Sequence, residues 1–311
     1  MNGKPELVLF SARGRESLPD CLATRLESSA AVTYCPTLTA LSDDEIVGQC
    51  ADARVVGLTR RACKDFHGGL VDRLPRLAGL AVFATGAEWL DTEALAKRRV
   101  QWRTLPDYST QTVAEHALGM LLALARRIHL SDRVVRAELP HTVSLRGWEL
   151  AGKCVGIVGL GKIGLRIARL VSAFDAKAVY CDPEVATSEY EAVPWERLLA
   201  ESDVIVLAAS VERGARPLID GEGLARMKRG AYLINPSRPQ LVDSEAALQA
   251  VLCGQLAGYG VDERVYSPAV LAGVEPGRIL QTGHTGWYSD EAMARGAGAW
   301  VENLIALAEA L

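Results

Sequence analysis

Three glycines in the middle of the chain place the strongest constraint on its fold. The segment 155–158 is short and apolar, as in a buried strand, and the segment 163–174 has helical periodicity. Between them, Gly159, Gly161 and Gly164 follow the spacing G-x-G-x-x-G. At this spacing the first glycine allows a tight turn, the second leaves room for a pyrophosphate, and the third lets helix and strand pack closely. The phosphates would lie at the positive end of the helix dipole.

An acidic residue follows at the distance expected for a dinucleotide site. A second apolar run, Ala176–Tyr180, is followed by Asp182, close to the roughly twenty residues that usually separate the glycines from an acidic ribose ligand. The carboxylate favours NAD over NADP, although Asp182-Pro183 could also be a turn that ends the strand. The cofactor-binding residues expected from this pattern are Gly159, Gly161, Lys162, Ile163, Gly164 and Asp182.

The composition is that of a chain able to bury a large core. A length of 311 residues, with 49% hydrophobic and 23% charged residues, suits one large or two ordinary domains. The net charge of −4 provides no positive surface for nucleic acid or an anionic membrane. Seven scattered cysteines without a C-x-x-C pair favour reduced thiols over a zinc site, and no signal peptide is evident. We expect a cytoplasmic protein without a bound metal.

Short apolar runs alternate with amphipathic segments, which predicts an α/β fold with parallel, doubly wound sheets. In the first part of the chain, strands are expected at 7–10, 31–34, 55–58, 80–83 and 100–102, with helices at 17–27, 42–50 and 91–98. Beyond the glycine motif, further strands are expected at 204–208, 232–234, 255–259 and 279–281. Long helices are expected at 112–130 and 290–311. The shared rhythm of the two halves predicts two similar sheets.

Three residues that can take part in chemistry directly follow predicted strands. Arg238 lies where open α/β sheets bind ligands, and its guanidinium can hold a carboxylate or phosphonate through two hydrogen bonds. His284 lies between small residues, and imidazole exchanges protons near neutral pH. Asp262 could hydrogen-bond a nicotinamide amide or cap the next turn. Each of these residues also has a purely structural interpretation. For Glu115 and His116 we favour a structural role in a largely buried helix.

Several ordered segments resemble the D-isomer-specific 2-hydroxyacid dehydrogenase family, which includes phosphoglycerate, glyoxylate/hydroxypyruvate, formate and phosphite dehydrogenases. The segments are 106–116, 150–164, 227–238, 241–243, 256–262 and 284–292. The resemblance implies a Rossmann NAD-binding domain, residues 101–284, inserted into a flavodoxin-like substrate domain, residues 1–100 plus 285–311. It implies an active site in the cleft between them. It also implies a homodimer formed through the NAD-binding domain, with the 112–130 helix at the interface.

The resemblance also implies roles for individual residues. Arg238 matches the substrate-binding arginine of the family and His284 its acid/base histidine. The substrate's carboxylate would meet the backbone of Ala84, Thr85 and Gly86. The remaining expected cofactor-binding residues are Ala208, Asp262, His284 and Gly286. The implied reaction is hydride transfer between NAD and a small anionic 2-hydroxy acid or 2-keto acid. The residues do not separate a carboxylate substrate from a phosphonate.

One departure from the family pattern bears on mechanism. The family places a glutamate before a proline, and this glutamate hydrogen-bonds the catalytic histidine; here the position is Ser267, followed by Pro268. Glu263 lies too early in the loop unless an irregular path repositions it. Without a carboxylate neighbour the imidazolium would be less stable, so His284 would be a poorer acid. This predicts a specialised substrate or a bias toward oxidation. Gly283, Pro239 and the segment 207–210 also depart from the pattern.

Two other classes of protein remain open. The segment 284–289 resembles that of corepressor-like relatives, which would make the chain an NAD(H)-sensing regulatory protein without turnover. A degenerate, purely structural paralogue is the other alternative. Retention of Arg238, Asp262, His284 and the glycine triplet argues against that paralogue.

Overall fold

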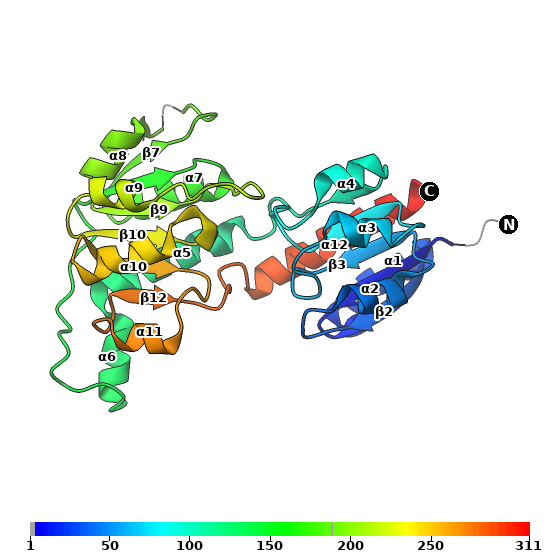
Figure 1. The fold of residues 1–311 in the computed structure, drawn as a ribbon, viewed down its shortest axis with the longest axis horizontal. Helices are drawn as coiled ribbons and strands as arrows, with labels where there is room; N and C mark the ends of the chain where they lie inside the picture. The colour runs from blue at the N-terminus through cyan, green and yellow to red at the C-terminus, as the bar shows by residue number, and fades with distance from the viewer. Residues whose placement is uncertain (1–3, 188) are drawn as a thin grey trace. The chain divides into compact units, whose positions relative to one another are not determined.

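The chain divides into two units, and the second is inserted into the first. The computed structural model describes residues 4–187 and 189–311. The first unit comprises Met1–Ser109 and Ser289–Leu311, and the second comprises Thr110–Tyr288 (Figure 1). The chain leaves the first unit only after its last strand has paired, so the second unit begins later than the expected residue 101. That the first unit binds substrate remains a prediction.

A five-stranded parallel sheet forms the centre of the first unit (Figure 1). Its strands, in the order β2-β1-β3-β4-β5, are Glu6–Ser11 (β1), Ala31–Pro36 (β2), Val55–Leu58 (β3), Gly79–Val82 (β4) and Gln101–Arg103 (β5). This is the flavodoxin-like order. The helices are η1 (Gly14–Ser17), α1 (Asp20–Ser29), α2 (Asp43–Cys50), α3 (Gly68–Asp72), α4 (Thr92–Lys97) and α12 (Asp290–Glu309). Strands β3 and β4 are buried along their whole length, as in a sheet covered on both faces.

Helix α12 comes from the far end of the chain and completes the first unit. It packs on α1, β3 and β4. Its Trp300 is buried, donates a hydrogen bond from Nε1 to the backbone oxygen of Ala81 (3.0 Å), and meets Phe83 edge to face with ring centroids 5.3 Å apart. The first unit therefore depends on residues from both ends of the sequence.

The second unit holds a seven-stranded parallel sheet in the order β12-β11-β10-β9-β6-β7-β8. Its strands are Cys154–Val158 (β6), Lys177–Cys181 (β7), Glu191–Ala192 (β8), Val204–Leu207 (β9), Ala231–Asn235 (β10), Leu256–Val261 (β11) and Ile279–Gln281 (β12). The order in which strands are added to the sheet reverses between β6 and β9, which is the topological switch point of the Rossmann fold. The helices are α5 (Thr110–Arg126), α6 (Ile128–Val135), α7 (Lys162–Ser172), α8 (Trp195–Glu201), α9 (Gly221–Arg226), η2 (Pro239–Leu241), α10 (Ser244–Leu252) and α11 (Pro268–Ala272).

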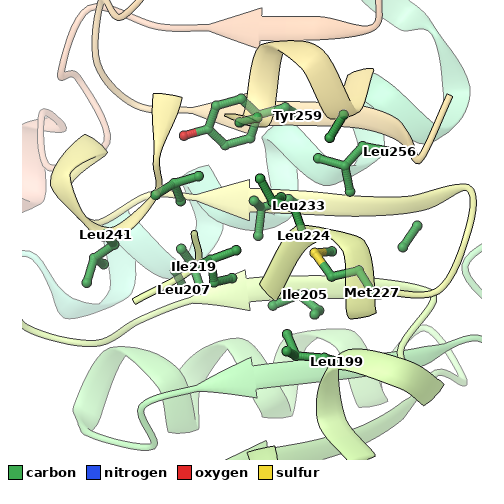
Figure 2. Packing of buried hydrophobic residues seen from close by; sticks show 14 of the residues in the cluster. Leu199, Ile205, Leu207, Ile219, Leu224, Met227, Leu233, Leu241, Leu256 and Tyr259 are labelled. Carbon is green, nitrogen blue, oxygen red and sulfur yellow. The ribbon is translucent and has the colours of Figure 1, made fainter. Parts of the chain in front are cut away.

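Both faces of this second sheet are covered. On one face, apolar side chains of β9, β10 and β11 pack against α8, α9 and α10, as Figure 2 shows for Leu199, Ile205, Leu224, Leu233 and Leu256. On the other face, buried residues of α5 and α7 pack against the strands. The prediction of two doubly wound parallel-sheet domains is thus confirmed.

The long predicted helix 112–130 is interrupted. Helix α5 ends at Arg126, and α6 begins at Ile128. Arg127 between them adopts a left-handed conformation with φ +53°, which breaks the run of helical backbone. Its Nη2 donates a hydrogen bond to the backbone oxygen of Pro276 (3.1 Å). The break thus coincides with a contact to a segment that is remote in the sequence. The local apolar pattern gives no sign of this contact.

None of the helices in the described ranges is long and apolar enough to cross a membrane. All seven cysteines are free thiols.

Candidate active site

The three motif glycines occupy distinct environments at the end of β6. Gly159 has φ +85°, and a Cβ there would lie 2.9 Å from the backbone nitrogen of Ala209. Gly164 faces the turn so closely that a Cβ would overlap the carbonyl oxygen of Gly159. A Cβ on Gly161, by contrast, would meet no atom within 4 Å. The turn is therefore closed on the protein side and open at Gly161, which fits the approach of a pyrophosphate.

Helix α7 starts at this open point. Gly161 is its N-cap residue and has no side chain to satisfy the first N–H groups. Lys162, exposed, and Ile163, half-buried, form the first turn with Gly164. The N-terminal end of a helix, through its backbone N–H groups and the helix dipole, favours an anion at such a point. The local structure fits the diphosphate of NAD.

Asp182 follows β7 and holds the glycine turn. Its carboxylate accepts hydrogen bonds from the backbone N–H groups of Leu160 (2.7 Å), Glu184 (2.8 Å) and Val185 (2.9 Å). Burial alone would raise the pKa of Asp182, but these hydrogen bonds outweigh it, so the pKa lies below its usual value. The group is therefore ionised at neutral pH. Ala208, at the end of β9, donates its N–H to the oxygen of Val158 (2.8 Å) beside the same turn.

Arg238 lies in a short loop after β10 that a buried amide organises. Asn235, the last residue of the strand, donates from Nδ2 to the oxygen of Arg238 (2.7 Å) and accepts at Oδ1 from the N–H of Ser237 (3.1 Å). The half-buried Arg238 guanidinium donates to the oxygen of Ser237 (3.0 Å). The only mark of this role of Asn235 in the sequence is an asparagine at a strand end, where its side chain can bond nearby backbone groups.

Asp262 anchors the loop that carries His284. Only 4% exposed, its carboxylate accepts from the hydroxyl of Thr282 (2.6 Å) and from the N–H groups of Thr285 (2.8 Å) and Gly286 (2.7 Å). A Cβ on Gly286 would lie 2.6 Å from Asp262 Oδ2, so only glycine fits there. Both carboxylate oxygens are used within the protein. A role toward the nicotinamide stays a prediction.

His116 joins this network from helix α5. Its Nε2 lies 3.2 Å from Thr282 Oγ1 and 3.6 Å from Asp262 Oδ1. The sequence indicated only a polar residue near one end of a largely buried helix. The structure shows in addition that this residue faces the end of β12. No local pattern contains that information, because the partners lie far away in the sequence.

His284 has an unusual backbone and a carboxylate neighbour. Its φ is +58°, and Trp287 Nε1 donates a hydrogen bond to its backbone oxygen (3.0 Å). The Nδ1 atom lies 3.1 Å from Oε2 of Glu263. That distance suits an ion pair, but the buried Nδ1 atom makes no hydrogen bond with acceptable angles to the described residues. The distance is the stronger indication of pairing, since a small rotation of the ring changes the angle far more than the separation.

Ser267 has a structural role instead. It is the N-cap of α11, and its Oγ accepts a hydrogen bond from the N–H of Val270 (3.3 Å), with Pro268 at the first helical position. The expectation that His284 lacks a carboxylate neighbour is therefore wrong. The loop after β11 follows the irregular path that brings Glu263 to the ring.

The expected substrate-binding residues of the first unit form a loop after β4. Leu105 N–H donates to the oxygen of Ala84 (2.8 Å), the Thr85 hydroxyl donates to the oxygen of Leu105 (3.0 Å), and Trp89 Nε1 donates to the oxygen of Gly86 (3.1 Å). Within the described part of the chain, no hydrogen bond uses the N–H group of Thr85 or Gly86. Those two donors remain available to an anion.

A metal site would need several suitable side chains close together. No group of three or more His, Cys, Asp and Glu side chains among the described residues could hold a metal ion.

Comparisons with known proteins agree with this geometry. The family model for the D-isomer specific 2-hydroxyacid dehydrogenase, NAD binding domain, matches residues 118–286. A glyoxylate reductase of Pyrococcus furiosus is 32% identical over 82% of this chain and 79% of its own length. The structure of protein TT0316 from Thermus thermophilus superposes with a TM-score of 0.86 at 30% identity, covering 98% of this chain and 97% of the other.

A second solved structure shows the same fold at lower identity. A glyoxylate reductase from Paecilomyes thermophila superposes with a TM-score of 0.87 at 21% identity, covering 99% of this chain and 96% of the other. The family match spans more than half of the chain. The chain belongs to the D-isomer-specific 2-hydroxyacid dehydrogenase family, and it is an NAD-dependent oxidoreductase of that family.

Proposed function

We propose that this enzyme transfers hydride between NAD and a small anionic 2-hydroxy or 2-keto acid, with Arg238 binding the substrate and His284 exchanging its proton. One observation carries the proposal. The NAD-binding turn after β6, Arg238 after β10 and His284 after β12 all follow carboxyl ends of strands in one parallel sheet. Parallel strands end at the same edge, where such sheets bind ligands.

Each residue has a chemical task suited to its position. When bound, NAD accepts or supplies the hydride. Arg238 neutralises the substrate's anionic group and orients it through parallel hydrogen bonds. His284 donates a proton to the substrate oxygen during reduction and removes one during oxidation. Asp262 keeps the backbone of the His284 loop in place. In the first unit, we assign the unused N–H groups of the Ala84–Gly86 loop to the substrate's carboxylate.

The substrate class follows from the family and from the relatives. Several matched relatives are named glyoxylate reductases, so glyoxylate and hydroxypyruvate are the first compounds to test as substrates. No observation on the described residues favours the alternative, an NAD(H)-sensing regulatory protein without turnover.

The test of this function is the rate of NADH oxidation with glyoxylate and hydroxypyruvate. We expect Arg238→Ala to lower kcat/KM by about a hundredfold or more, because two charge-assisted hydrogen bonds to the substrate are lost. The Kd for NADH, measured by fluorescence, should stay unchanged. Arg226→Ala is the matched control, since Arg226 is an exposed residue of α9. Full activity of the Arg238 variant would exclude the assigned anion site, and a wild-type protein that binds NADH without turnover would exclude the function.

We also propose a homodimer formed through the second unit. Ile128 and Val135 on α6 are 58% and 82% exposed, which is high for large apolar side chains. Exposed apolar side chains of this size are typical of a surface that a second chain covers. Free cysteines throughout the chain support a reducing compartment such as the cytoplasm.

A further inference from the structure

We propose that Glu263 is the carboxylate that positions His284 and stabilises its protonated form, in place of a glutamate at position 267. The inference rests on the proposed function, since it takes His284 as the group that exchanges the proton. It assigns a role to a residue whose place in the sequence differs from the position of the family glutamate. Glu263 is a positioning residue, because it acts through His284.

The contact is short and partly shielded from water. Oε2 of Glu263 lies 3.1 Å from Nδ1 of His284, with side chains 33% and 30% exposed, respectively. The Nδ1 atom itself is buried and unsatisfied within the described residues. A buried ring nitrogen this close to a carboxylate can donate a hydrogen bond to it once the N–H bond points at the carboxylate oxygen. Such bonds are often poorly aligned before substrate binds and tighten in the reacting complex.

The path of the chain explains how Glu263 reaches the ring. Asp262 and Glu263 are consecutive residues that directly follow β11. Asp262 accepts hydrogen bonds from the N–H groups of Thr285 and Gly286, so it holds the backbone that directly follows His284. The two adjacent carboxylates therefore have different contacts. Asp262 fixes the backbone of the His284 loop, and Glu263 lies beside the His284 side chain.

A glutamine clamp holds the rest of the loop after β11. Oε1 of Gln281, the last residue of β12, accepts from the N–H groups of Val265 (3.2 Å) and Tyr266 (3.0 Å). Its Nε2 donates to the oxygen of Tyr266 (2.8 Å). Tyr266 is buried and donates its hydroxyl proton to the oxygen of Ser244 (2.7 Å). These bonds tie the loop to β12, the strand that leads to His284, and Ser267 then starts α11.

A carboxylate on the Nδ1 side of the ring suits this proton exchange. A carboxylate there favours the tautomer with a proton on Nδ1 and stabilises the imidazolium, which leaves Nε2 for the substrate oxygen. In reduction, Nε2 of the imidazolium gives its proton to the carbonyl oxygen, while a bound reduced nicotinamide would supply the hydride that the carbonyl carbon gains. The imidazolium becomes imidazole and Glu263 stays ionised. In oxidation, Nε2 takes the hydroxyl proton as the carbon loses its hydride.

The test is Glu263→Gln, which keeps the size of the side chain and removes the charge. We expect kcat/KM for 2-keto acid reduction at neutral pH to fall about tenfold or more. The pH at which reduction falls to half its plateau should move down by about one pH unit, because less imidazolium remains at a given pH. Oxidation at neutral pH should fall less, since it uses the neutral ring. Glu245→Gln, an exposed glutamate of α10, is the matched control.

A second measurement needs no turnover. The ring resonance of His284, identified by its absence in His284→Asn, is followed by NMR through a pH titration in wild type and in Glu263→Gln. A lower titration midpoint in the variant supports the pairing. An unchanged midpoint with an unchanged pH–rate profile overturns it, while loss of activity in Arg238→Ala would still uphold the proposed function.

Discussion

The backbone of His284 lies in a region that side chains other than glycine rarely adopt. A left-handed conformation costs a β-carbon-bearing residue on the order of 1 kcal/mol. Two contacts offset this strain: Asp262 holds the next peptide, and the Trp287 indole holds the His284 carbonyl. Strain of this kind persists where the surrounding structure holds the residue and function uses its position. The conformation fits the role proposed for His284, in which its ring would face the substrate.

Substitutions of the motif glycines can distinguish an effect on folding from an effect on cofactor binding. A methyl group on Gly161 meets nothing in the protein, whereas one on Gly164 overlaps the turn at Gly159. We therefore expect Gly161→Ala to keep the wild-type melting temperature but to weaken NADH binding, because the methyl group lies where the pyrophosphate approaches. Gly164→Ala should lower the melting temperature by several degrees.

Thermal denaturation and fluorescence titration with NADH distinguish the two effects. Gly152→Ala is unsuitable as a control, because Gly152 has φ +73°. Gly298→Ala is suitable, since a Cβ there has open space within helix α12. Unchanged NADH affinity in Gly161→Ala would show that the cofactor does not approach this turn.

At the scale of the elements, helix α12 supplies a part of the first unit's core from the far end of the chain. It starts at Asp290 with Ser289 as N-cap and buries apolar residues along one face against the first sheet. Trp300 contributes both apolar area and a hydrogen bond to β4 through Ala81. The first unit thus lacks part of its core until the last residues of the chain are in place.

Replacement of Trp300 tests this dependence. Trp300→Ala should lower the free energy of unfolding by about 3–5 kcal/mol through the cavity it leaves. Trp300→Phe should cost about 1–3 kcal/mol, since it leaves the Ala81 oxygen without its buried donor. Chemical denaturation followed by circular dichroism measures both. Trp102→Phe, at an exposed position of β5, is the control, and equal stability of all three variants would contradict the assigned role.

At the scale of the whole molecule, the exposed apolar residues of α6 predict self-association. We expect sedimentation equilibrium to give about twice the chain mass of 33.4 kDa. Val135→Glu should shift the population toward the monomer, because a charge would be buried in the interface. Leu252→Glu, at the end of α10, changes another large exposed apolar residue and should leave the mass unchanged. A wild-type protein that sediments as a monomer would exclude the dimer.

Most strands of the two sheets could be predicted because each of these strands is a short, continuous run of apolar residues in the sequence. Buried runs such as Val55–Leu58 and Cys154–Val158 are continuous in the sequence and directly indicate strands. The sequence does not predict the short strand β8, since Glu191–Ala192 is exposed and carries no apolar pattern. Nor does the sequence predict the break at Arg127, because nothing in the apolar run marks a residue with positive φ.

The amino-acid sequence by itself determined the NAD-binding turn, since strand, glycines, helix and Asp182 all lie within one short βαβ unit. Their geometry depends on local backbone sterics and on hydrogen bonds between near neighbours. Only the tertiary structure decided the surroundings of His284. Its nearby carboxylate, Glu263, belongs to another loop, and that loop is held by the Gln281 side chain through hydrogen bonds. A side chain's neighbours across two loops depend on the path of each loop, and residue spacing alone does not specify that path.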